Sequence, residues 1–224
     1  MASSRDRAFC LRKVEFSETS QILTLFCRRT GIVRAIAKGA HRRTKVGASN
    51  FDGGVDLLDV GDCVFIDHAS RDLSTLTEWK LIEGHLSLRT SLRAMLLAQY
   101  LAEVLSVLLA DRDPHPVLFD RLRVTLPALS TASAEEHFLS MHLDILQGTG
   151  YFPDFADTSA DGHSRIDPRL FRVAETILKL PRDRSVPQRL PRLTRAQTDP
   201  LTRFLGNQIQ AIVQRPLQTL RYVI

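Results

Sequence analysis

The chain has 224 residues, of which 44% are hydrophobic and 25% charged, as in an ordinary globular protein. Three cysteines, Cys10, Cys27 and Cys63, form no CxxC pair, which argues against a disulfide framework and favours buried thiols in a reducing compartment. The N-terminus is polar, and the most apolar stretch, 95–110, carries polar residues. We therefore expect no signal peptide and no membrane span, and predict a cytoplasmic protein.

The net charge of +5 conceals a strong segregation along the chain. Residues 1–50 hold eleven Lys or Arg and three acids, and residues 51–80 hold two Lys or Arg and seven acids. Residues 81–150 hold five Lys or Arg and eight acids, and residues 151–224 hold twelve Lys or Arg and seven acids. Two basic ends thus flank an acidic middle, which indicates a polyanionic partner, although a merely solvated basic surface is the alternative.

The first third of the chain carries strand signals. Short runs rich in β-branched and aromatic residues are separated by turn residues, and they occupy 7–16, 21–29, 32–38, 55–60 and 63–67. Thr30-Gly31 predicts a hairpin turn, because glycine tolerates a positive φ. Five or six short strands predict a small closed barrel, and the OB-fold is the small barrel that commonly binds oligonucleotides.

Strand alternation predicts which side chains of 32–38 face the barrel interior. Val33, Ala35 and Ala37 fall on one face and suit the interior, whereas Arg34 and Lys38 fall on the other. The two cations therefore stand outside and lead into a basic loop.

Aromatic residues could either stack on bases or fill the core. Phe9, Phe16, Phe26 and Phe51 sit among apolar neighbours, which favours the core for all four, and the same holds for Tyr100. Trp79 follows the end of the barrel, and we expect it to pack between two domains.

From residue 81 onward the pattern is helical. The first two predicted helices span 92–109 and 117–129. A third begins at Ser133, where Glu136 completes a capping box, and ends at 148 or 150. A fourth runs from Asp167-Pro168 to a residue before 181, and a fifth from Asp199-Pro200 to 214. The first is apolar on nearly every side, as a buried central helix is. We predict an α+β fold, with an OB-fold domain over 1–80 and an all-helical domain over 81–224.

Four segments in order along the chain carry a family resemblance. They are "ETSQILTLFCRRTGIVRAIAKGAHRR" (18–43), "LSTLTEWKLIE" (73–83), "QGTGYFPDF" (147–155) and "QRPLQTLRYV" (214–223). Together they resemble RecO, the bacterial recombination mediator family. The first segment is fairly specific, and the other three gain weight from their order.

The sequence departs from the family at one place. Many members carry four zinc-binding cysteines after the Gly-Tyr-x-Pro-Asp segment, but 155–168 contains none, and His163 alone cannot supply a tetrahedral site. We therefore expect no metal and no cofactor, and we predict that the zinc region, 151–167, is reduced to a loop.

The resemblance implies binding of single- and double-stranded DNA, annealing of complementary strands, and assistance in loading RecA with a RecR partner and the acidic tail of single-stranded DNA-binding protein (SSB). It also implies association with the nucleoid. No nucleotide-binding loop, GxSxG or HExxH motif is present, so we expect no enzyme. The alternative is a protein-interaction scaffold of the same fold with weak or no DNA binding.

The candidate site residues are cations. The DNA-binding candidates, in decreasing order of support, are Lys38, Arg42 and Arg43, then Arg34 and Lys45, then Arg12, Lys13, Arg28 and Arg29. Arg121 and Arg172, within predicted helices, are the candidates for binding an acidic partner tail. The Arg-rich stretch 182–195 either extends the DNA path or makes a loop soluble.

Overall fold

A computed structural model describes residues 3–38, 51–52, 54–68, 73–152, 167–179 and 191–224. The chain divides into two compact units. The barrel unit comprises Met1–Leu86 and Leu105–Asp120, and the helical unit comprises Ser87–Val104 and Arg121–Ile224. The domain boundary at residue 80 stays a prediction.

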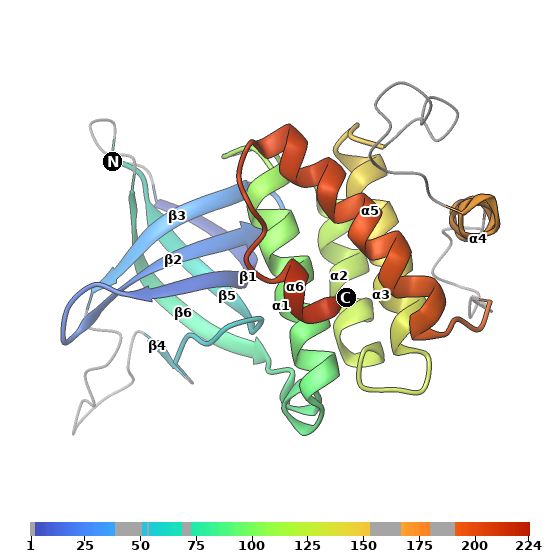
Figure 1. The fold of residues 1–224 in the computed structure, drawn as a ribbon. Coiled ribbons are helices and arrows are strands. Elements are labelled where there is room, and N and C mark those ends of the chain that lie inside the picture. The colour runs from blue at the N-terminus through green and yellow to red at the C-terminus, as the bar shows by residue number, and fades with distance from the viewer. Residues whose placement is uncertain (1–2, 39–50, 53, 69–72, 153–166, 180–190) are drawn as a thin grey trace. The chain divides into compact units, whose positions relative to one another are not determined.

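The barrel unit is built from one sheet that closes on itself (Figure 1). Its strands are β1 (Ser3–Glu15), β2 (Ser20–Cys27), β3 (Gly31–Lys38), β4 (Phe51–Asp52), β5 (Val60–Ile66) and β6 (Ser74–Glu83). The hydrogen-bonded order is β3-β2-β1-β5-β6-β4, and parallel pairing of β3 with β6 closes the barrel. The predicted OB-like barrel followed by a helical region is confirmed.

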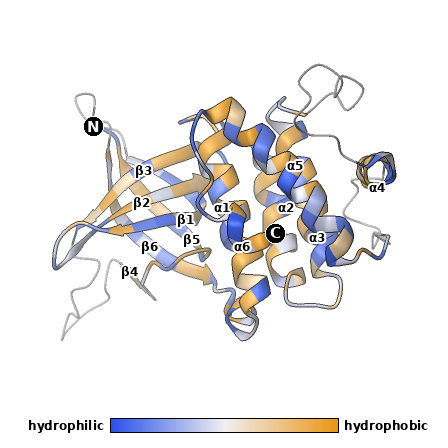
Figure 2. Ribbon diagram, viewed as in Figure 1, coloured by the Kyte–Doolittle hydropathy of each residue, from blue (hydrophilic) through white to orange (hydrophobic). Residues whose placement is uncertain are grey.

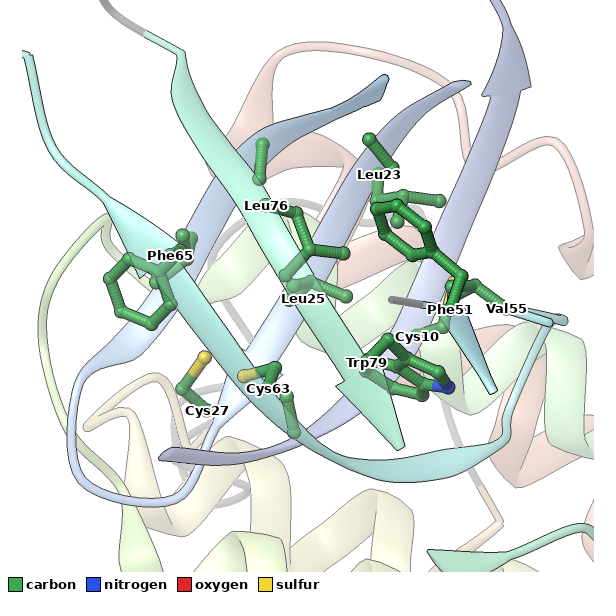
Figure 3. Close-up of a cluster of buried hydrophobic side chains, with 14 residues drawn as sticks. Cys10, Leu23, Leu25, Cys27, Phe51, Val55, Cys63, Phe65, Leu76 and Trp79 are labelled. Atoms are coloured by element: carbon green, nitrogen blue, oxygen red, sulfur yellow. The ribbon is translucent and has the colours of Figure 1, made fainter. Parts of the chain in front are cut away.

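Side chains alternate along the strands as expected for a small barrel, and hydrophilic and hydrophobic residues alternate with them (Figure 2). Val33, Ala35 and Ala37 are buried, whereas Arg34 and Lys38 are exposed, as predicted. The interior is an apolar cluster that β1, β2, β3, β5 and β6 share (Figure 3).

Trp79 belongs to this interior, which corrects the expectation that it packs between domains. Its side chain is 1% exposed and lies beside Phe51 and Cys10 (Figure 3). The strand β5 makes room for the indole with Gly61, where an added Cβ would lie 2.4 Å from a ring atom of Trp79. The indole is therefore a structural core residue of the barrel.

The connection between the first two long helices contacts the start of strand β3. The backbone N–H of Arg112 donates to the carbonyl of Ile32 (3.1 Å), and Asp111 forms an isolated bridge to the same strand residue. The backbone of Asp113 lies so close to Gly31, which has φ +79°, that no side chain fits there. This contact explains why the chain segment after residue 104 belongs to the barrel unit.

Arg112 secures that connection with its side chain. Its guanidinium donates to Ser74 Oγ (2.7 Å) and to Asp67, and it lies over the ring of Phe65. Burial alone would raise the pKa of Asp67, but hydrogen bonds from Ser74 and Arg112 lower it below its ordinary value. The ends of β5 and β6 are thereby tied together.

The described residues after the barrel strands are mainly helical. They are a short 3-10 helix (Leu86–Thr90), α1 (Leu92–Leu108), α2 (Pro116–Ala128), α3 (Ala134–Gly148), α4 (Pro168–Leu178), α5 (Arg195–Val213) and α6 (Leu220–Val223). The predicted helices are thus all present. The core of the helical unit centres on Tyr100 of α1 and on Phe138 and His142 of α3, whose rings are in contact.

Helix starts agree with the sequence only in part. Asp167 caps α4 by accepting a hydrogen bond from the amide of Arg169 (2.8 Å), as predicted. The expected capping box at Ser133 is absent, because Glu136 is buried and accepts from the amide of Leu193 instead (2.8 Å). The long helix α5 begins before the expected Asp199-Pro200, and Pro200 lies within it.

Candidate nucleic-acid interface

The outer face of the β1–β2–β3 sheet carries three of the described cations that the sequence predicts as DNA contacts, namely Arg12, Arg34 and Lys38. Arg34 and Lys38 alternate outward on β3. A bulge between Cys10 and Arg12 shifts the register of β1, so that Arg12 pairs with Thr24. Without this bulge, strict alternation would place Arg12 on the same face as the buried Cys10.

The pairing register arranges these residues in rows across the three strands. Thr24 pairs with Arg12 on one side and with Arg34 on the other, so that the two arginines flank it. At the end of the sheet Lys38 pairs with Ser20. The row with the arginines and the row with the lysine are four residues apart, which is about 13 Å along a strand.

The cations of this face differ in how firmly they are held. Arg34 forms an ion pair with Asp111 at 3.4 Å, and the two side chains are 57% and 52% exposed. Lys38 and Arg12 are exposed and make no ion pair with another described residue. Since exposed ion pairs contribute little, roughly 0–1 kcal/mol, Arg34 can exchange its partner for a phosphate.

Three of the predicted DNA contacts lie outside the described residues. These are Arg42, Arg43 and Lys45, in the segment 39–50 that follows Lys38 directly. Residues 182–190 of the Arg-rich stretch, and residues 153–166 of the region predicted to be a reduced zinc loop, are also outside them.

The other predicted DNA contacts are engaged in ion pairs within the barrel unit. Lys13 lies 2.9 Å from Asp56. Arg28 donates two hydrogen bonds to Asp120, at 3.0 and 2.9 Å, and the Asp120 side chain is only 13% exposed. Such two-point contacts are directional and stronger than a single exposed pair.

Arg29 is held by the buried carboxylate of Asp6. The Arg29 amide donates to Asp6 Oδ2 (3.0 Å), and its guanidinium lies 3.5 Å from Oδ1. Thr30 Oγ1 donates to the same carboxylate (2.7 Å), so Asp6 organises the β2–β3 hairpin. An open cavity of about 410 Å³ adjoins this hairpin, and its lining comprises Arg5, Asp6, Arg7, Arg28, Arg29 and Asp62.

The two candidates for partner binding differ in their surroundings. Arg121 of α2 donates to Asp144 Oδ2 (2.8 Å) and to Ser140 Oγ (3.2 Å), and its side chain is 16% exposed. Arg172 lies on the exposed side of α4. An incoming carboxylate would have to compete with Asp144 for Arg121 but not for Arg172.

Most aromatic residues of the barrel unit are buried, either inside the barrel or against its outer face. Phe9, Phe26 and Phe51 are buried, as is Tyr100 of the helical unit, and these predictions are confirmed. Phe16 was predicted to be a core residue, and that prediction is wrong, because its side chain is 62% exposed. The residue directly follows β1, and its side chain is not part of the apolar cluster inside the barrel.

The three thiols are free and buried. Figure 3 shows the sulfurs of Cys27 and Cys63 facing one another inside the barrel. The hydrogen bond with Cys63, together with burial, raises the pKa of Cys27, and burial raises the pKa of Cys10 to about 12. The thiols of Cys10 and Cys27 therefore stay protonated at neutral pH, and this disfavours a role for these two residues as nucleophiles or metal ligands.

Two features are absent from the described part of the chain. Within it, no group of three or more His, Cys, Asp or Glu side chains could hold a metal ion. No helix in the same residues is both long enough and apolar enough to cross a membrane.

Comparison with known protein families agrees with the barrel and the helical region. Residues 1–85 match the family described as "Recombination protein O N terminal", and 89–221 match "Recombination protein O C terminal". The chain belongs to the RecO family. The two matches together span nearly all of both the barrel unit and the helical unit of this RecO-family chain.

Individual relatives are proteins named DNA repair protein RecO. One from Rhodopirellula baltica is 42% identical over 130 residues, or 58% of this chain and 46% of the relative. One from Salinibacter ruber is 33% identical, over 58% of this chain and 48% of the relative. One from a Polaromonas species is 32% identical, over 82% of this chain and 73% of the relative. The similarity thus spans about half the length of the first two relatives.

Proposed function

We propose that this RecO-family protein acts in DNA repair by binding single- and double-stranded DNA and annealing complementary strands. The family and the names of its relatives support the repair role. The observation that carries DNA binding is the outer face of β1–β2–β3, where Arg12, Arg34 and Lys38 gather on one surface. Lys38 leads directly into the segment with Arg42 and Arg43.

The proposed binding is mainly electrostatic. Cations that neutralise phosphates release condensed counterions, and this supplies affinity without regard to base sequence. Annealing uses the same effect, because neutralised backbones let two strands approach. We propose Lys38, Arg42, Arg43, Arg34, Lys45 and Arg12 as the main contacts. Lys13, Arg28 and Arg29 contribute less, because each already has a carboxylate partner.

The proposed partners are RecR and the acidic tail of SSB, with which the protein would assist the loading of RecA. Arg172 supports the second of these, since an exposed arginine on a helix can pair with a carboxylate. We propose no catalytic step and no cofactor.

A salt series with a labelled oligonucleotide tests the proposal. If Lys38, Arg42, Arg43, Arg34 and Lys45 neutralise five phosphates, the plot of log affinity against log salt should have a slope of about −3.5 for a single strand. Replacing Arg42 and Arg43 together by Ala should weaken all sequences alike. Affinity that ignores salt, or a loss confined to one sequence, would contradict phosphate binding.

A protein-interaction scaffold is the second candidate function. The ion pairs of Arg7 with Asp62 and of Arg28 with Asp120 favour it, because they reduce the net positive charge that the barrel offers to DNA. A scaffold would capture RecR or an SSB tail peptide but would bind no oligonucleotide even at low salt, which separates the two functions.

A further inference from the structure

The outer face of the β1–β2–β3 sheet carries an exposed apolar strip between its rows of cations. Val14 pairs with Ile22, and Ile22 pairs with Ile36, so that three aliphatic side chains stand side by side across the strands. Val14 is 42% exposed, and the two isoleucines are partly exposed. The strip lies between the Arg12–Arg34 row and the Ser20–Lys38 row, about 7 Å from each.

The other half of the same face shows what a covered surface looks like here. Phe9 pairs with Phe26, and both rings contact Phe119 of the barrel unit, at centroid distances of 4.8 and 5.6 Å. All three phenylalanines are buried. The same sheet face is therefore closed by an aromatic residue at one end and presents apolar side chains to solvent at the other.

Phe16 extends the exposed strip at its outer edge. Its amide donates to the carbonyl of Ser20 (2.9 Å), which continues the β1–β2 ladder by one pair beyond the strand. The turn is held by reciprocal hydrogen bonds between Ser17 and Ser20, at 3.1 and 3.3 Å. Alternation puts Phe16 on the same face as Arg12 and Val14, in the row that ends with Lys38.

The charges around the strip are mostly positive. Arg12 and Arg34 border it on one side and Lys38 on the other, and Asp111 offsets part of the charge of Arg34. Glu15 points to the opposite face, where it accepts a hydrogen bond from Gln21 Nε2 (2.9 Å). Glu18 in the hairpin turn adds one exposed negative charge.

We propose that this strip is the base-stacking track of a single-stranded nucleic acid site, with Phe16 as its principal stacking residue. The proposal rests on the DNA binding proposed above and adds a preference for unpaired strands. Cations on both sides suit a phosphate backbone, and apolar side chains between them suit base faces. A duplex keeps its base faces stacked on one another, so it can use the cations but not the strip.

The test compares three labelled ligands at one salt concentration: an oligothymidylate, a strand of equal length with abasic sites in place of its bases, and a duplex. The protein variants are Phe16→Ala and Phe16→Tyr, with Tyr222→Ala as the control. Tyr222 is also an exposed aromatic residue, at 50%, but it lies in the helical unit. Thermal unfolding of each variant checks that the fold is intact.

We expect Phe16→Ala to weaken oligothymidylate binding by about 5- to 150-fold, the range for losing one base–aromatic stack. Its affinity for the abasic strand and the duplex should be unchanged, and Phe16→Tyr should restore binding, because tyrosine also offers a stacking face. The salt dependence should stay as in the wild type, since no cation is removed. Tyr222→Ala should match the wild type on all ligands.

Two results would overturn the proposal in distinguishable ways. In the first result, the wild type binds oligothymidylate in a salt-dependent manner, and Phe16→Ala either binds it equally well or loses affinity for abasic and base-bearing strands alike. The strip then does not stack bases. DNA binding by the cations would then still stand. If the wild type binds none of the ligands at low salt, the proposed DNA binding itself fails, and the stacking track fails with it.

Discussion

The hydroxyl of Tyr100 lies 3.3 Å from Nε2 of His142, in the core of the helical unit. His142 is completely buried, and Nδ1 has no hydrogen-bond partner among the described residues. Burial lowers the pKa of His142 to about 3 from its ordinary 6.5. The imidazole is therefore neutral in the folded protein throughout the physiological range, and protonating it requires unfolding of its surroundings.

Stability of the helical unit should fall as the pH drops below 6.5. The unfolded chain binds a proton on His142 with its ordinary pKa, whereas the folded chain does not until about pH 3, so stability is complete above pH 6.5 and is lost between these values. The expected loss from this residue is about 2 kcal/mol between pH 7 and pH 5. Denaturant unfolding at a series of pH values measures it.

His142→Phe should remove most of this pH dependence. His137→Gln, on the same helix, is the matched control. Burial also lowers the pKa of His137, but this side chain is only half-buried, so its variant should change the pH dependence less. If the unfolding free energy of His142→Phe depends on pH as steeply as that of the wild type, another group controls acid unfolding.

Arg121 is expected to stabilise the helical unit. Its guanidinium is paired with Asp144, whose side chain is 8% exposed, so Arg121→Glu would set two carboxylates against each other in a poorly solvated place. Breaking such a pair costs about 3–5 kcal/mol. The Tm should fall accordingly, and the charge-swapped double variant with Asp144→Arg should recover part of the loss. No change in Tm would show that the pair is dispensable.

The barrel could be predicted from the sequence because strand alternation and turn residues are local signals. Val33, Ala35 and Ala37 point inward because their spacing in the chain already matches the pleat. Trp79 was placed wrongly because its neighbours are distant in the sequence. Phe51 is its partner in a short parallel pairing, and Gly61 on another strand makes room for its ring.

The candidate site could be predicted in its charges but not in its pairing. The basic residues are visible in the sequence, whereas their partners Asp111 and Asp120 follow far along the chain, the first in the connection between α1 and α2 and the second within α2. The bulge that turns Arg12 outward depends on the register with β2. Phe16 was misjudged because apolar residues close to it in the sequence do not show whether anything covers the outer face of the sheet, and Val14 on that face is itself exposed.

Folding and DNA binding should survive strong chelation. The chain has no cysteine after Cys63, and the described residues contain no cluster able to hold a metal. A structural zinc supplies folding energy directly, so its removal would unfold the region that it organises. We expect the same Tm and oligonucleotide affinity with and without chelator. Stoichiometric zinc by elemental analysis, lost together with stability, would contradict this.

Lys38→Ala should weaken DNA binding only through the loss of one lysine–phosphate contact. Lys38 is exposed at the end of β3 and has no described ion-pair partner, so its removal leaves no buried charge. The salt slope for a single strand should become shallower by about 0.7, the value for one phosphate contact. Lys179→Ala, an exposed lysine in the helical unit, should leave the slope unchanged. A slope unaffected by Lys38→Ala would remove it from the interface.

An acidic peptide with an apolar end, the chemistry of the SSB tail, should depend on Arg172 if the helical unit binds it. Arg172 is exposed within α4, whereas Arg121 is already paired, so a charge reversal at Arg172 tests peptide contact without disturbing the core. We expect Arg172→Glu to weaken binding of the peptide by about 1–3 kcal/mol, because a charge-assisted contact is lost. Fluorescence anisotropy of a labelled peptide measures this change. Thermal unfolding and oligonucleotide affinity should both stay at the wild-type values. Unchanged peptide affinity in Arg172→Glu, or no binding by the wild type, would place the partner site elsewhere or exclude the partnership.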